Sequence, residues 1–239
     1  MFKDLVNGLR VFINKKTPIV LALLLSTFFG FNYVSNTLSE DLILGVSLKE
    51  YPSFLINYYG FELLWFLVLV FGFFFLTNYA TYLISHIINK SNKKILADIP
   101  NCITYTFFVS LIFLALGIIG YLSMLYLGAF AIVLLVIIGI LALVISLETT
   151  FGLIFLAVSK NIKESLNRAW VFLKQKFWIL LLLIIILGII NFMISYFFEL
   201  ILYKYQDSET IALILYASIN VIISAYMTGV FSSFIKKRK

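Results

Sequence analysis

The chain has 239 residues, of which 63% are hydrophobic and only 12% are charged. An ordinary globular protein is roughly half apolar and a quarter charged, so a mean hydropathy of +1.08 excludes a soluble fold and a disordered chain. The single cysteine, Cys102, and the single histidine, His86, exclude a disulfide framework and a structural zinc site, which needs about four ligands. The composition therefore predicts an all-α integral membrane protein, and no metal or cofactor is expected.

Six transmembrane helices in a single polytopic membrane domain explain the hydropathy, because one spanning helix needs roughly 20 apolar residues. They are expected at about 18–33, 61–88, 103–120, 127–158, 177–202 and 211–234. The stretch 99–147 contains no charged residue and is too long to cross a bilayer once, so it must form a hairpin. The residues that favour a turn at a membrane interface within this stretch are Gly117, Gly120, Tyr121, Tyr126 and Gly128.

Lysine and arginine are distributed very unequally between the two sides of this six-span arrangement. All but Lys49 and Lys204 of the 18 basic residues lie on the side of the two termini. Because cytoplasmic loops carry the excess of Lys and Arg, both termini are expected in the cytoplasm. The net charge of +7 then reflects orientation rather than nucleic-acid binding, and the expected partners are the lipid bilayer and anionic lipid headgroups at the cytoplasmic face.

Amphipathic segments precede spans one and five, at residues 2–14 and 161–176, and a weaker one at 93–102 precedes span three. Their apolar residues gather on one side of a helix, as in helices that lie in a membrane interface. In the first segment this side consists of Phe2, Leu5, Val6, Leu9, Phe12 and Ile13, and in the second of Ile162, Leu166, Ala169, Trp170 and Leu173. The residues expected to anchor these interfacial helices are Leu9, Phe12, Leu166, Trp170 and Trp178. Asn161 followed by Glu164 predicts an N-terminal cap for the second helix.

The segment from Lys160 to Trp178 resembles a motif of a superfamily of six-span membrane proteins. This superfamily includes the membrane domain attached to some glycerophosphodiester phosphodiesterases and several bacterial and archaeal families of unknown function. The matching residues are Glu164, Leu166, Arg168, Trp170, Lys174, Phe177 and Trp178, and Ala169 stands where the family often has Ser. The resemblance implies six spans in a prokaryotic cell membrane. It implies no activity, because the phosphodiesterase of that family is a separate soluble domain that these 239 residues do not contain.

Glu148 is the ionisable residue placed most deeply in the predicted membrane region. Ser146, Thr149 and Thr150 lie beside it, with apolar sequence on both sides. Ionisable groups inside a membrane are costly and commonly functional, so Glu148 is a candidate proton or cation site. Alternatively, its carboxyl is protonated or partly hydrated and caps a break in a long span.

A polar stripe follows the cytoplasmic half of span two. Its members recur at helical spacing and therefore share one face of the helix: they are Asn78, Tyr82, Ser85 and Asn89. His86 lies at the edge of this face. Such a stripe can line a polar pathway or bind a lipid headgroup. More commonly it forms hydrogen bonds between helices.

The sequence lacks the residue sets that membrane enzymes need. We find neither the clustered acidic residues of a metal-dependent phosphatidyltransferase, nor paired histidines for a protease metal, nor a P-loop. The sequence therefore predicts a non-catalytic scaffold or accessory module that binds partners or lipids at its cytoplasmic face. The possible protein partners include a second copy of the same chain. The alternative is a small secondary transporter or channel with a pathway near spans two and four, and an intramembrane enzyme comes third.

Overall fold

The computed structural model describes residues 6–43, 52–89, 95–128, 130–159, 161–204 and 209–236. Helices account for nearly all of these residues, and none of them is in a strand. The elements in chain order are the short 3-10 helix η1 (Leu9–Val11), α2 (Thr17–Ile43), α3 (Pro52–Asn89), the 3-10 helix η2 (Ile95–Asp98), α4 (Ile99–Tyr126), α5 (Phe130–Leu156), α6 (Ile162–Lys204) and α7 (Glu209–Lys236).

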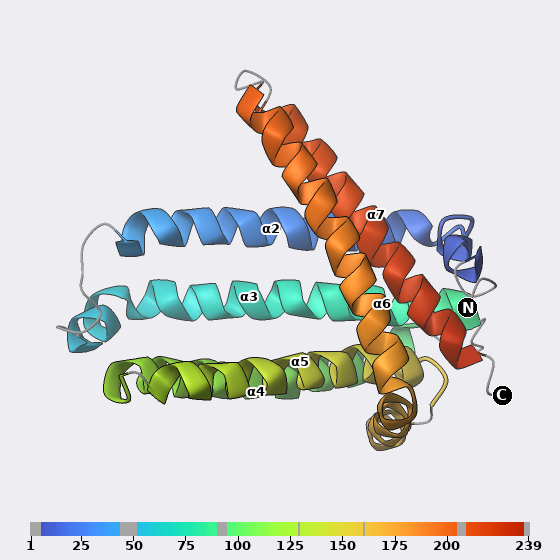
Figure 1. The fold of residues 1–239 in the computed structure, drawn as a ribbon, viewed down its shortest axis with the longest axis horizontal. Coiled ribbons are helices and arrows are strands. Elements are labelled where there is room, and N and C mark those ends of the chain that lie inside the picture. Colours follow the sequence, from blue (N-terminus) through green and yellow to red (C-terminus); the bar gives the residue numbers. More distant parts are fainter. Residues whose placement is uncertain are drawn as a thin grey trace.

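The long helices alternate in direction along the chain. α2, α3 and the α4–α5 hairpin run side by side, and the α6–α7 hairpin crosses them obliquely (Figure 1). As a result α2, α4 and α6 begin at the same end of the molecule at which α3, α5 and α7 end. We call this the basic end, because the flanking segments of the sequence on this side carry most of the Lys and Arg residues.

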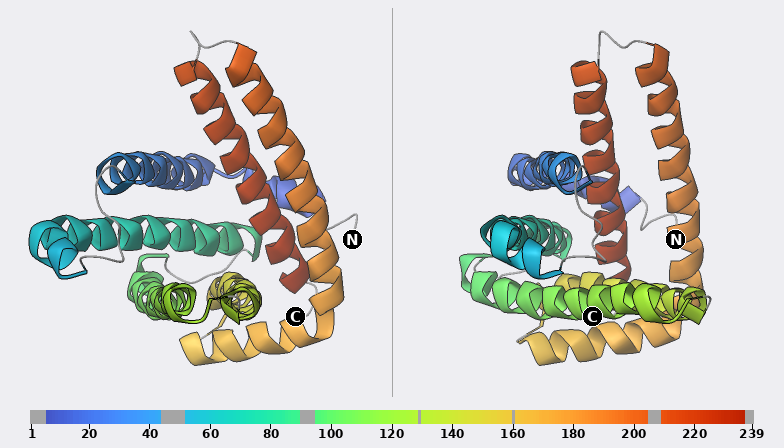
Figure 2. Two further views of the ribbon diagram at one scale, coloured as in Figure 1. Left: turned by 60° about the vertical axis from the view of Figure 1, so that its left-hand side comes forward. Right: turned by 90° about the vertical axis from the view of Figure 1, so that its left-hand side faces the viewer.

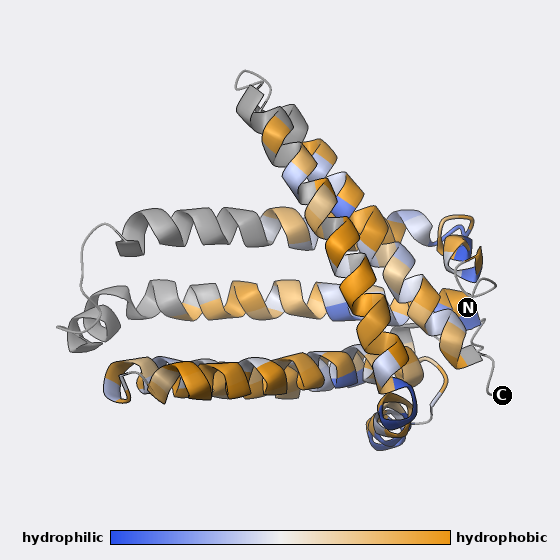
Figure 3. Cartoon of the chain, viewed as in Figure 1, coloured by the Kyte–Doolittle hydropathy of each residue, from blue (hydrophilic) through white to orange (hydrophobic). Residues whose placement is uncertain are grey.

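Five of the described helical segments are long and apolar enough to cross a membrane. They are Leu67–Asn89, Ile99–Tyr126, Phe130–Leu156, Ile162–Ile194 and Ile214–Ile235. The described apolar part of α2, Thr17–Gly30, is shorter. Hydrophobic residues cover α4, α5 and the middle of α6, whereas hydrophilic residues gather near the basic end (Figure 3). The prediction of an all-helical chain compatible with several membrane crossings is thus confirmed.

The predicted hairpin in the uncharged stretch is present, but its turn lies at the late end of the predicted cluster. α4 continues to Tyr126, and the chain turns at Gly128, whose φ of +52° favours glycine. Gly117, Gly120 and Tyr121 therefore lie within α4, and the predicted span 103–120 ends too early. Gly120 has a packing role instead, because a Cβ there would contact Leu135 of α5 at 3.4 Å.

The N-terminal segment is less helical than predicted. Residues 1–5, including Phe2 and Leu5, lie outside the described part of the chain, and the described segment turns after η1. Two local hydrogen-bonding residues explain the turn: the Thr17 hydroxyl donates to the carbonyls of Val11 and Asn14, and the Asn14 side chain accepts the Lys16 N–H at 3.0 Å. Such side chain to backbone bonds compete with helix formation. Residues 12–14 therefore do not extend the predicted helix.

A single helix contains both the predicted interfacial segment 161–176 and the predicted span 177–202. No proline or glycine separates them, so nothing in the local sequence ends the helix. Two further views show the first part of α6 running across the end of α5 before the helix changes direction sharply and follows α7 (Figure 2). The start of α6 is therefore oriented differently from its remainder.

The buried core is concentrated at the basic end. One cluster joins the N-terminal segment to α2, α3 and α7 through residues such as Val11, Val20 and Ala225. A second cluster packs the start of α6 onto α5 and the end of α7 through Phe151, Ile154, Ala169, Phe172, Leu173, Phe231 and Ile235. These contacts fix the first turns of α6 relative to its two neighbours.

Candidate functional site

The polar stripe of α3 is buried except at Asn89, which is partly buried, and two of its members form hydrogen bonds to neighbouring helices. The Asn78 amide donates to the Thr106 hydroxyl of α4 at 3.0 Å, and the Ser85 hydroxyl donates to the Ile154 carbonyl of α5 at 2.7 Å. The Asn89 amide in turn donates to Ser85 Oγ at 3.1 Å. Buried polar groups of this kind need partners, and here they connect three helices. This geometry favours the interpretation of the stripe as hydrogen bonding between helices.

Tyr82 and His86 complete the stripe near the basic end, where a buried acid joins them. The Tyr82 hydroxyl donates to a carboxylate oxygen of Asp98 at 2.8 Å. Asp98 is only 6% exposed and also accepts a hydrogen bond from the Asn101 amide at 3.1 Å. His86 is buried as well, with its ring centroid 6.1 Å from that of Tyr82.

The sequence reasoning did not single out Asp98. Its position immediately before the first turn of α4, which carries Pro100, marks it as a residue at a helix start. That signal predicts a cap, whereas the Asp98 side chain makes no capping hydrogen bond and instead accepts a hydrogen bond from the Tyr82 hydroxyl.

Glu148 lies on α5 outside this hydrogen-bond network. Its side chain is partly buried, and its carboxylate makes no hydrogen bond with any other residue that the structure describes. The neighbouring hydroxyls of Thr149 and Thr150 donate to carbonyls one turn earlier in α5. Among the described residues, no hydrogen bond links the Glu148 carboxylate to Asn78, Tyr82, Ser85 or His86.

Helices α4, α5 and α6 meet at Gly152. The Ser165 hydroxyl of α6 donates to the Gly152 carbonyl. On another side of this glycine, a Cβ would lie 2.1 Å from the Tyr105 hydroxyl oxygen of α4. Only glycine therefore allows this close approach of α4 to α5, while the Ser165 hydrogen bond holds the start of α6 on α5.

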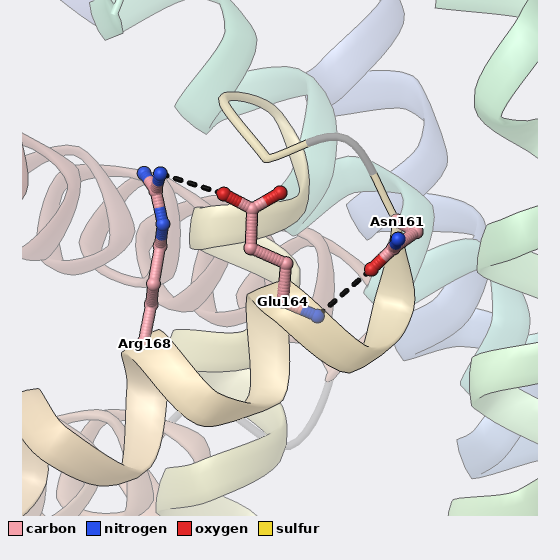
Figure 4. A network of polar contacts seen from close by, with 3 residues as sticks. All are labelled: Asn161, Glu164 and Arg168. Carbon is pink, nitrogen blue, oxygen red and sulfur yellow. Dashed lines mark hydrogen bonds and ion pairs between the residues drawn. The ribbon is translucent and has the colours of Figure 1, made fainter.

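Asn161 caps the start of α6 as the sequence predicts. Its side-chain oxygen accepts the Glu164 backbone N–H at 2.9 Å, while the Glu164 carboxylate pairs with Arg168 at 2.7 Å rather than turning back to the cap (Figure 4). The cap is therefore half of a capping box, and the other half is replaced by an ion pair one turn along the helix.

Asn161→Ala is expected to lower the free energy of unfolding by about 1 kcal/mol, because it leaves an N–H of the first turn without its side-chain partner. Thermal unfolding in detergent measures the loss. Asn167→Ala is the matched control, since Asn167 is an exposed asparagine on the same helix. Equal effects of the two substitutions would contradict the capping role.

The predicted apolar face of the α6 start is divided between two environments. The buried side chains are Ser165, Ala169, Phe172 and Leu173. The side of α6 that packs against the rest of the protein is therefore the side of Phe172, and it is rotated from the apolar face that the sequence predicts. Trp170, a member of the predicted face, is 44% exposed, and Lys174 Nζ lies 5.0 Å from the centre of its ring. Of the other predicted anchors, Leu9 and Trp178 are exposed, and Phe12 and Leu166 are partly buried. Their exposed apolar surface is available to a lipid phase.

An open groove of about 830 Å³ lies at the basic end, between the end of α5, the start of α6 and the end of α7. We call it the α6 groove. Its apolar residues are Phe155, Val158, Val171, Phe172 and Ile235. Its polar residues, all from the start of α6, are Asn161, Lys163, Glu164, Asn167 and Arg168. The groove is thus lined by a set of apolar side chains, which we call its floor, and by a set of cationic, acidic and amide side chains, which we call its rim.

Comparisons of the sequence with protein-family models, with curated proteins and with solved structures find no match. Within the described ranges, no group of three or more His, Cys, Asp or Glu side chains is placed to hold a metal ion. The α6 groove and the buried stripe are therefore interpreted from their own geometry.

Proposed function

We propose that this chain is a non-catalytic integral membrane protein with six spans and both termini in the cytoplasm, and that it serves as a scaffold or accessory module. Its basic end binds anionic lipid headgroups at the cytoplasmic face of a prokaryotic cell membrane. The observation that carries the proposal is the alternation of the long helices, which brings the basic flanking segments of the sequence to one end. A polytopic protein with such an end is oriented by its positive charges.

The sixth span of the proposal is α2. Its described part is apolar from Thr17 to Gly30, and the helix itself continues to Ile43. A helix of 27 residues is about 40 Å long at 1.5 Å per residue, which exceeds the hydrocarbon thickness of a bilayer. The resemblance of residues 160–178 to six-span membrane proteins supports the same number.

The lipid-binding part of the proposal is tested with the purified full chain in neutral detergent. Short-chain phosphatidylglycerol or phosphatidylcholine is added, and the thermal unfolding midpoint is measured. A ligand that binds only the folded state raises this midpoint, so we expect phosphatidylglycerol to stabilise the protein more than phosphatidylcholine. Added salt should reduce the difference, because it screens charges near the surface. Equal midpoints with both lipids would contradict the proposal.

A small transporter is the second candidate, and its supporting observation is the Glu148 carboxylate, which has no hydrogen-bond partner among the described residues. Glu148→Gln separates the two functions, because it keeps the size of the side chain and removes its titration. For a scaffold we expect the variant to fold with a stability close to the parent. Proton-linked flux in liposomes that is present in the parent and lost in a folded Glu148→Gln variant would favour the transporter.

A further inference from the structure

We propose that the α6 groove is a specific binding site for one anionic phospholipid, with the phosphodiester at the Lys163 rim and the first part of an acyl chain along the apolar floor. This inference rests on the proposed function and narrows it from a charged surface to a defined site. It differs from general attraction to anionic lipid because it assigns unequal roles to cations on the same helix.

The rim of the groove carries net positive charge. Among the described residues that line it, Glu164 is the only acidic one, and the Arg168 guanidinium lies 2.7 Å from its carboxylate. Lys163 is exposed and makes no ion pair with another described residue. The ammonium of Lys163 is therefore the charge available to a phosphate, and phosphates bind well to lysine as a point charge.

Amide donors lie next to this cation. The Asn161 side-chain oxygen accepts the Glu164 N–H, which leaves the Asn161 NH₂ directed away from the cap as a donor. Asn167 is exposed on the next turn. A phosphodiester has several acceptor oxygens and no donor, so the Lys163 ammonium and these two amides complement it.

The floor of the groove is suited to hydrocarbon rather than to water. Phe155 comes from the last turn of α5, Val158 from the turn that follows α5, and Ile235 from the end of α7. A volume of about 830 Å³ is in the range of small-molecule binding sites in general, about 300–1,000 Å³. The polar rim and the apolar floor together match a molecule with a charged headgroup and an apolar tail.

The place of the groove in the fold also fits a phospholipid. It lies where α5 and α7 end and where the first part of α6 crosses before the helix turns to follow α7 (Figure 2). In the six-span arrangement this level is the cytoplasmic headgroup layer. In the sequence, Ile235 is followed directly by the basic tail Lys236, Lys237, Arg238 and Lys239. Phosphate and acyl chain are therefore both present at this level of the membrane.

The test compares Lys163→Gln with Lys174→Gln in the full chain. Both substitutions remove one positive charge from the start of α6, but Lys174 lies over Trp170 and does not line the groove. The probe is short-chain phosphatidylglycerol, titrated while the thermal unfolding midpoint is followed. We expect Lys163→Gln to weaken apparent phosphatidylglycerol affinity about fivefold, the effect of one cation near anionic lipid. Lys174→Gln should leave that affinity close to the parent value.

Val158→Trp is the second variant, because it fills the floor of the groove without changing any charge. It should also weaken phosphatidylglycerol binding, while its midpoint without lipid confirms that the variant folds. Equal weakening by Lys163→Gln and Lys174→Gln, with no effect of Val158→Trp, would overturn the groove site and leave general attraction to anionic lipid. Absence of any phosphatidylglycerol effect on the parent protein would overturn the proposed function itself.

Discussion

Gly152→Ala is expected to lower the free energy of unfolding by about 1–3 kcal/mol, the usual cost of excess volume in a packed interior. The added methyl group would lie 2.1 Å from the Tyr105 hydroxyl oxygen and 2.9 Å from the ring carbon that bears it. Tyr105 is only 3% exposed, so it has little room to move away. The effect should be visible as a lower thermal unfolding midpoint in detergent, and Gly152→Leu should lower it further.

Gly139→Ala is the matched control on the same helix. No heavy atom lies within 4 Å of a Cβ at Gly139, and alanine favours a helix over glycine by about 1 kcal/mol. The two alanine substitutions in α5 should therefore have opposite signs. Tyr105→Phe should partly rescue Gly152→Ala, because it removes the closer of the two contacts. Additive effects of these two substitutions would contradict the contact.

Tyr82→Phe is expected to lower the free energy of unfolding by about 1.5–3 kcal/mol, the range for a hydrogen bond to a charged group. The substitution removes the 2.8 Å bond to Asp98 and leaves a carboxylate that is 6% exposed with fewer donors. Hydrogen bonds between helices in membranes average only about 0.6 kcal/mol. The larger value is expected here because the acceptor is a buried carboxylate that keeps its desolvation cost.

Tyr79→Phe is the control for this prediction. Tyr79 lies one turn earlier on α3, is only partly buried, and stacks its ring on those of Phe75 and Tyr82. Its hydroxyl makes no hydrogen bond with the described residues, so its loss should cost little. If both phenylalanine variants unfold at the same midpoint as the parent, the Tyr82 bond contributes nothing to stability.

The long helices could be predicted from the sequence because the length of an apolar run is a local property. Runs near Phe130 and Ile214 give helices close to the expected spans. Errors occurred where contacts that the apolar pattern does not record decide the structure. Gly120 resembles a turn residue in the sequence, but it is the place where α5 approaches α4. The N-terminal helix ends early because Asn14 and Thr17 form local hydrogen bonds that a pattern of apolar residues does not reveal.

The candidate site was predictable only in part. The Asn161 cap and the cations of α6 follow from residue spacing within one helix, and the cap is present. The Tyr82–Asp98 hydrogen bond joins α3 to η2, which are separate elements of the chain. The spacing of residues within one helix therefore could not predict it. The α6 groove needs residues from α5 and α7 beside α6, and only the fold brings Phe155 and Ile235 together.

The most direct test of the proposed arrangement is the accessibility of single cysteines in intact cells. Cys102 is buried and can be replaced by serine to remove background labelling. We expect a membrane-impermeant thiol reagent to label Ser47→Cys and Gln206→Cys from outside. Asn92→Cys and Asn167→Cys should be labelled only after the membrane is permeabilised. Labelling of Asn167→Cys from outside would contradict six spans with a basic cytoplasmic end.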